Sequence, residues 1–169
     1  NADYMLASQS EVVADHLTEV EVYLGNTVAP GSFGWLVPLS DSRAFAGLVS
    51  RQRLNGRMPR FLSALEQMGK VRSVVSEPKR WGIPIKPLQK TFGDRVVVVG
   101  DAAGLAKPTT GGGIYYALVS GEIAANSVHR SFAAGDCSAR QMSSYEREWK
   151  AVFGRELQIG YCARGLYEA

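Results

Sequence analysis

The chain has 169 residues, of which 46% are hydrophobic and 21% charged, and its formal net charge is +3. This composition is typical of an ordinary globular protein, and the length suffices for one large domain or two small ones. No apolar stretch approaches the ~20 residues that a membrane-spanning helix needs, and no nucleic-acid-binding motif accompanies the mild positive charge. The two cysteines, Cys137 and Cys162, have no CxxC spacing and no nearby histidine. We therefore expect no disulfide framework and no metal site, and a reducing, cytoplasmic compartment.

Basic side chains gather at two places in the first half, residues 51–60 and residues 79–80. Side chains of this kind bind phosphates or anionic lipids in some proteins. A solvated basic face is the more frequent explanation of such groups. Both interpretations stay open at the level of sequence.

Residues 16–50 carry the pattern of antiparallel strands. His16–Leu24 alternates in polarity as a half-buried strand does, and a Gly-Asn turn follows it. Ser32–Leu39 and Arg43–Ser50 predict two further strands, with Ser40–Asp41–Ser42 as the hairpin loop between them.

A short helix and weaker strands follow. Pro59–Met68 carries one apolar side and ends at Gly69, which predicts an amphipathic helix. Val71–Val75 and Lys79–Ile85 predict strands that nearby prolines restrict to edges or breaks. We therefore expect residues 3–87 to form an antiparallel β region with one short helix.

The second half contains a strand, a glycine-rich loop and a helix. Val96–Val99 is β-branched without polar alternation, which is typical of a strand covered on both faces in a parallel sheet. A loop with several glycines follows Gly100. A helix is predicted from Ile114, because the apolar residues that follow recur at helical spacing and indicate one buried stripe. The stripe comprises Ile114, Leu118, Gly121, Ala125, Val128 and Phe132.

The chemistry of such a loop suits a phosphate or another electron-rich oxygen. Unpaired backbone N–H groups and the positive end of a helix dipole meet there. Asp101 is an acceptor when ionised, so it suits sugar-type hydroxyls. The simpler alternative is that Asp101 caps a turn and the glycines only break the chain.

The order of residues in this loop resembles a known motif. Gly100-Asp101-Ala102-Ala103-Gly104, followed by Pro108-x-x-Gly111-Gly112-Gly113-Ile114, is similar to the second FAD-binding motif of flavoproteins related to p-hydroxybenzoate hydroxylase. The resemblance implies that Asp101 binds the ribityl hydroxyls, that the Ala103–Gly104 backbone lies near the pyrophosphate, and that Gly112 and Gly113 lie near the flavin's N1/O2 side. The implied cofactor-binding residues are Gly100, Asp101, Ala103, Gly104, Pro108, Gly111, Gly112 and Gly113.

A second motif lies in the first half. Pro30-x-x-Phe33-Gly34-Trp35-x-x-Pro38 resembles the Pro-x-x-Tyr-x-Trp-x-x-Pro signature of the geranylgeranyl reductase family. The resemblance implies that Phe33 and Trp35 form the wall of a pocket for a long isoprenoid chain. Phe33 replaces the usual tyrosine, so any polar role of that hydroxyl is lost. Without the motif, two core aromatics on a strand would be the simpler interpretation.

The last part of the chain predicts a helix that packs on the sheet. Ser138 offers an N-cap, and apolar residues follow it at helical spacing. These are Met142, Tyr145, Trp149, Val152 and Phe153.

Together these resemblances imply a geranylgeranyl reductase-type, FAD-dependent oxidoreductase. The expected fold is α+β / α/β: an antiparallel-sheet substrate domain over residues 3–87, and over residues 88–169 the C-terminal strand–loop–helix part of an FAD-binding domain. The Gly-x-Gly-x-x-Gly fingerprint of the first βαβ unit is missing, so the Rossmann-like sheet is expected to be incomplete. We therefore expect the carboxyl-terminal part of a longer enzyme, with apolar surface exposed around Val96–Val99 and a tendency to self-associate.

The implied reaction is reduction of carbon–carbon double bonds in prenyl chains by hydride from reduced flavin. The electron donor, NAD(P)H or another reductant, is left open, as is peripheral contact with a membrane that holds prenyl lipids. No proton donor is assigned, and Tyr115 and Tyr116 are interpreted as helix-packing residues. Two alternatives remain at this level: a flavin monooxygenase or dehydrogenase on the same fold, and a non-catalytic interaction module.

Overall fold

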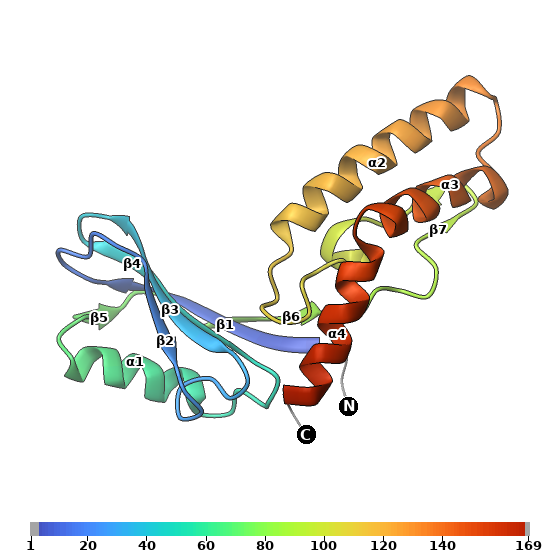
Figure 1. Cartoon of the computed structure of the whole chain (residues 1–169). Coiled ribbons are helices and arrows are strands. Elements are labelled where there is room, and N and C mark those ends of the chain that lie inside the picture. Colours follow the sequence, from blue (N-terminus) through green and yellow to red (C-terminus); the bar gives the residue numbers. More distant parts are fainter. Residues whose placement is uncertain (1–3, 168–169) are drawn as a thin grey trace. The chain divides into compact units, whose positions relative to one another are not determined.

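The structure is a computed structural model that describes residues 4–167 (Figure 1). The chain forms two compact units, Met5–Gly82 and a second that runs from Ile83 onward, and each has its own hydrophobic core. The mixed α and β class with an antiparallel sheet is confirmed. The outer limits of the predicted domains, residues 3 and 169, lie outside the described residues.

The first unit is built on one sheet. Its strand order is β2-β3-β4-β1-β5, and β6 also pairs with β1. The ladders that join β2 to β3, β3 to β4, β4 to β1 and β1 to β5 are all antiparallel. The strands are β1 (Tyr4–Val13), β2 (Glu21–Leu24), β3 (Phe33–Ser40), β4 (Arg43–Ser50), β5 (Ser73–Val74) and β6 (Lys79–Pro84).

Helix α1 (Arg57–Gln67) covers one face of this sheet (Figure 1). Side chains alternate along a strand, so the residues that face α1 are every second one. On β3 and β4 these include Leu36, Ala46 and Leu48, which are fully buried against Phe61 and other apolar residues of α1. The residues between them point to the opposite face of the sheet.

The β3–β4 hairpin, α1 and β6 agree with the prediction to within one or two residues, whereas two other predicted strands of this unit are shorter. The predicted strand His16–Leu24 keeps only its last four residues as β2, because His16 adopts a φ of +59° and turns the chain. The predicted Val71–Val75 strand is reduced to β5. Strand β1 was not predicted, because its buried residues lie on both faces and give no clean alternation.

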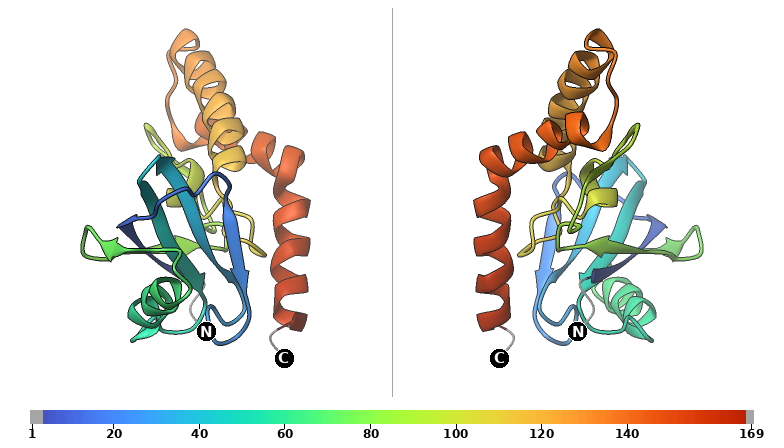
Figure 2. Two further views of the ribbon diagram at one scale, coloured as in Figure 1. Left: turned by 90° about the vertical axis from the view of Figure 1, so that its left-hand side faces the viewer. Right: turned by 90° about the vertical axis from the view of Figure 1, so that its right-hand side faces the viewer.

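The second unit is mostly helical. A two-stranded antiparallel ribbon leads into a short 3-10 turn and then into the helices. A π-helical turn, Lys150–Gly154, separates the last two helices, and the chain bends sharply there (Figure 2). The elements are β7 (Phe92–Gly93), β8 (Val96–Val97), the turn η1 (Gly100–Ala103), α2 (Ile114–Ala133), α3 (Ala139–Trp149) and α4 (Arg155–Tyr167).

The prediction of a doubly covered parallel strand over Val96–Val99 is wrong. Only Val96 and Val97 form a strand, and their partner is the antiparallel β7. Val96 and Val99 are exposed, while Val97 and Val98 pack against the helical core. Among the described residues no parallel strand lies beside β8, and Val96 and Val99 expose apolar surface, as expected of an incomplete sheet.

Helix α2 is confirmed, but the face predicted to be buried is exposed. Ile114 is 81% and Phe132 72% exposed, and Leu118 is also exposed. The residues that α2 buries are mostly small. They are Tyr116, Ser120, Ala124, Ser127 and Ser131.

The small side chains of α2 face α3, which runs back alongside it (Figure 1). The Ser127 and Ser144 hydroxyls hydrogen-bond at 2.8 Å between the two helices. Ser131 turns its hydroxyl onto its own helix and donates to the Ser127 carbonyl at 2.9 Å. Local bonds of this kind allow serines to be buried in a helix contact.

The N-cap predicted for α3 is confirmed. The Ser138 hydroxyl oxygen accepts the Gln141 N–H at 3.4 Å, and Asp94 accepts the Ala139 N–H at 2.7 Å. Two chain segments therefore satisfy the first donors of α3. In the part of the chain that the structure covers, no helix is both long and apolar enough to cross a bilayer, and no three metal-ligating side chains cluster.

Candidate flavin-binding loop and aromatic strand

The turn η1 is tied directly to α2. Gly100 adopts a φ of +55° and donates its N–H to the Ser120 hydroxyl at 3.2 Å. A Cβ on Gly100 would lie 3.0 Å from the Cβ of Ala117, so the turn and the helix pack closely. The end of β8 is thereby held against the first turns of α2.

The structure brings Asp101 and Gly113 together. Asp101 is exposed, and a Cβ built on Gly113 would lie 2.1 Å from its Oδ1. The carboxylate therefore rests in the space that only a glycine leaves open at the start of α2. No side chain caps this helix start and no acidic residue lies in its first turn. The loop thus combines a hydroxyl acceptor with a helix N-terminus whose dipole favours negative charge.

Gly104 has a structural task. It is buried with a φ of +70°, and a Cβ there would lie 2.1 Å from the Lys86 carbonyl oxygen. Its N–H already donates to the Asp101 carbonyl at 2.9 Å. Ala103 is also fully buried. These two residues therefore shape the turn from inside.

The loop before α2 closes on itself. Lys107 donates its N–H to Gly112 and accepts that of Gly111, at 2.9 and 2.8 Å. Gly111 has a φ of +75°, which only glycine adopts readily. Gly112 stays exposed, and the nearest atom to a Cβ there would be the Thr110 hydroxyl oxygen at 3.5 Å. Space therefore remains open beside Gly112 and Asp101.

Arg164 anchors this loop from α4. It is 4% exposed and donates to the carbonyl oxygens of Pro108 and, at 3.4 Å, of Thr109. Because a buried guanidinium is costly without acceptors, these carbonyls offset part of the cost of burying it. The sequence does not predict this role, since no local pattern links Arg164 to a loop 55 residues earlier.

Two tyrosines beneath the loop are engaged by hydrogen bonds. The Tyr145 hydroxyl donates to the Val98 carbonyl at 2.8 Å, and burial raises the pKa of Tyr145 to about 12. The Tyr116 hydroxyl donates to Glu156 at 2.7 Å, and burial together with this bond raises the pKa of Tyr116. Tyr116 also packs edge-on against Phe153. Both side chains therefore stabilise the helical core and are poor acids near neutral pH.

The first unit gathers the predicted aromatics on one strand. Phe33 and Trp35 lie on the sheet face that α1 leaves uncovered, and both are half-buried. A Cβ on Gly47 would lie 2.3 Å from the Trp35 ring, so the ring lies flat on the neighbouring strand. The Trp35 indole N–H donates to Gln9 at 3.1 Å. The two ring centroids are 6.0 Å apart, which makes a continuous aromatic strip suited to a long apolar chain.

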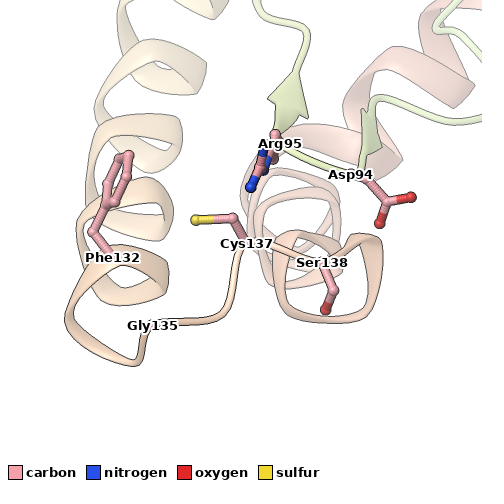
Figure 3. A pocket seen from close by; sticks show the side chains of 6 residues that line it. All are labelled: Asp94, Arg95, Phe132, Gly135, Cys137 and Ser138. Carbon is pink, nitrogen blue, oxygen red and sulfur yellow. The ribbon is translucent and has the colours of Figure 1, made fainter.

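A pocket that the sequence did not predict lies where the C-terminal end of α2 meets the β7–β8 turn (Figure 3). Its volume is about 610 Å³, and Arg95 and Cys137 point into it. Asp94, also in its wall, is occupied as a cap of α3. Among the residues that line the pocket, no base accompanies the thiol, so the pocket offers no nucleophile–base pair.

Known proteins resemble this chain along nearly its whole length. No protein-family model matches it. A digeranylgeranylglycerophospholipid reductase from Methanosphaerula palustris is 32% identical, and the match covers 86% of this chain and 39% of the relative. A geranylgeranyl bacteriochlorophyll reductase-like protein from Thermoplasma acidophilum has a solved structure that superposes with a TM-score of 0.82 at 26% identity, over 98% of this chain and 44% of that one. These relatives support the assignment of this chain to a geranylgeranyl reductase-type family of FAD-dependent oxidoreductases, which it resembles over part of their length.

These similarities confirm the resemblance inferred from the two sequence motifs. The flavin-dependent halogenase CmlS shares the fold, with a TM-score of 0.64 at 19% identity over 89% of this chain and 30% of that one. The chain spans 38 to 43% of the length of the curated relatives it matches first. It therefore corresponds to one part of such a reductase.

Proposed function

We propose that the chain is part of an FAD-dependent reductase that saturates carbon–carbon double bonds in geranylgeranyl or other prenyl chains. The observation that carries the proposal is the contact between Asp101 and Gly113 at the uncapped start of α2. It brings the two ends of the sequence motif, residues 100–104 and 108–114, together at one exposed site, which we call the flavin cradle. Relatives named for the reduction of geranylgeranyl lipids supply the reaction class.

Three residues of the cradle would touch FAD, and five would shape it. Asp101 would accept hydrogen bonds from the hydroxyls of the ribityl chain, and Gly112 and Gly113 would admit the flat ring to the start of α2. The dipole of α2 would stabilise negative charge on that ring edge. The shaping residues are Gly100, Ala103, Gly104, Pro108 and Gly111.

FAD, once reduced, would supply the hydride for the double bond. The chain's own contribution to the substrate would come from residues 3–87, where Phe33 and Trp35 pack against the prenyl chain and exclude water. Residues 88–169 would hold the flavin. The Pro30–Pro38 motif favours this reductase over a monooxygenase on the same fold.

The rest of the enzyme would complete the flavin site. In this chain Val96, Val99 and one face of α2 expose large apolar side chains. We propose that the part of the reductase outside the matched 39% covers this surface, and that the chain alone self-associates through it. NAD(P)H or another reductant would reload the flavin, and a prenyl-lipid substrate would bring the enzyme to the membrane surface.

The experiment is a flavin titration of the reductase with its remaining part supplied, followed by reduction of a prenyl lipid. Asp101→Ala should weaken FAD binding about ten- to hundredfold, because a hydrogen bond to a charged group contributes about 1.5–3 kcal/mol. Asp41→Ala, an equal change in the exposed β3–β4 turn, is the control and should leave binding unchanged. FAD binding that survives Asp101→Ala would contradict the assigned cradle, and the absence of prenyl reduction would contradict the function.

A further inference from the structure

The first unit has a pocket of its own, separate from the Phe33–Trp35 strip. One residue from each of the two basic groups, residues 51–60 and 79–80, lines this pocket. Its volume is about 260 Å³. Arg53, from the loop before α1, and Arg80, on β6, both line it. The two arginines are 27 residues apart in the chain, so only the fold places them at one cavity.

The cationic side of this pocket is not neutralised. No acidic residue lines it, and no ion pair or hydrogen bond joins either guanidinium to another described residue. Other cations of this unit are paired: Arg43 lies 2.8 Å from Glu11 and Lys70 lies 2.6 Å from Glu21. Arg53 and Arg80 therefore keep their donors free at the same opening.

The other side of the pocket is apolar. Trp81, Leu6 and Leu54 line it, and Trp81 is 42% exposed. Two free guanidinium groups beside an indole ring match a molecule with an anionic head and a hydrocarbon body. Among anionic groups, a phosphate fits best, because arginine's planar fork binds its oxygens in pairs.

We propose that Arg53 and Arg80 bind the phosphate of an amphiphilic lipid whose first carbons lie against Trp81. The proposal rests on the proposed function in one respect, that the hydrocarbon is a prenyl chain. It adds a headgroup site that would set which prenyl compounds the reductase accepts. Free inorganic phosphate shares the head chemistry, so the test must separate the two sources.

The test measures equilibrium binding of three probes to the 169-residue chain: farnesyl monophosphate, farnesol and inorganic phosphate. Farnesyl monophosphate should bind at least about tenfold more tightly than farnesol, and Arg53→Gln/Arg80→Gln should remove that advantage. Arg60→Gln/Lys79→Gln is the matched control, since it removes the same charge from the same two basic groups at residues that do not line the pocket. Farnesol should bind all three proteins equally.

Three results would overturn the headgroup site: no binding of farnesyl monophosphate, unchanged binding in Arg53→Gln/Arg80→Gln, or an equal loss in the control pair. Inorganic phosphate that binds as tightly as farnesyl monophosphate would overturn the lipid assignment in favour of a free-phosphate site. None of these results depends on flavin or on turnover. Failure of the reductase proposal, which is read from FAD binding and prenyl reduction, is therefore distinguishable.

Discussion

Substituting Gly113 by alanine tests the flavin cradle by adding a single methyl group beside the Asp101 carboxylate. Gly113 has φ −109° and ψ −20°, which alanine adopts without strain, so the backbone has no reason to move. The new Cβ would lie 2.1 Å from Oδ1 of Asp101, whereas ordinary contacts begin at 3.4 Å. The carboxylate oxygen must therefore move by more than an ångström.

The cost of that movement should appear in binding and not in folding. Asp101 is exposed and the displaced atom is the end of its side chain, so we expect the free energy of unfolding to change by less than about 1 kcal/mol. A hydrogen bond between a carboxylate and a flavin hydroxyl contributes about 1.5–3 kcal/mol to the binding free energy. Its loss should therefore weaken FAD binding about ten- to hundredfold.

The assay pairs a flavin titration of the complete reductase with urea denaturation of the chain. Gly165→Ala is the control, because it is the same change in another helix, α4, with nothing within 4 Å of the new Cβ. It should bind FAD normally and gain slightly in stability. Normal FAD binding by Gly113→Ala, or an equal loss in Gly165→Ala, would refute the reasoning.

Two further predictions concern the stability of the second unit. Gly104→Ala should lower the free energy of unfolding by at least about 2–3 kcal/mol, because φ is +70° and the Cβ would lie 2.1 Å from the Lys86 carbonyl. Gly135→Ala, with a φ of +66° but open space, should cost only about 1–2 kcal/mol in the same urea titration, and equal losses would show that the contact is irrelevant. For Glu146, burial raises the pKa, but hydrogen bonds from Lys150 and Thr91 outweigh it and hold the pKa below its ordinary 4.5. The ionised Glu146 should therefore contribute fully to the free energy of unfolding above pH 4.5, and this contribution should be lost as the pH falls through the lowered pKa. Urea titrations at pH 7, 4 and 3 measure the loss, which Glu146→Gln should not show.

The local sequence pattern was sufficient to predict secondary structure where both sides of a buried contact belong to this chain. The hairpin of Ser32–Leu39 and Arg43–Ser50 and the helix near Pro59–Met68 were predicted almost to the residue, because alternation and periodicity there report a core that lies within the chain. Helix α2 shows the limit. Its period was correct but its face was wrong, because the apolar stripe lacks a partner among the described residues and α3 covers buried serines that a hydrophobic pattern does not reveal.

The candidate site likewise combines features that the local sequence pattern predicts with contacts that it does not. The motif predicted that Asp101, Gly112 and Gly113 contact FAD, which stays a prediction, and the structure places Asp101 against Gly113. It did not predict the buried clamp of Arg164 on Pro108 or the packing of Gly104 against Lys86. Those contacts join segments that are distant in the sequence, and no spacing rule encodes them.

The serine contact between α2 and α3 has a consequence for assembly. Ser127 reaches Ser144 across only 17 residues, so this helical hairpin forms from neighbours in the chain, at a small loop-closure cost. The first unit's sheet, by contrast, must pair Leu6 with Ser50. The apolar stripe of α2 should therefore form together with the α2–α3 hairpin, before another part of the enzyme covers it. A reductase divided at this surface should reassemble from two separately produced pieces by docking, because little of the binding energy is consumed in ordering the chain.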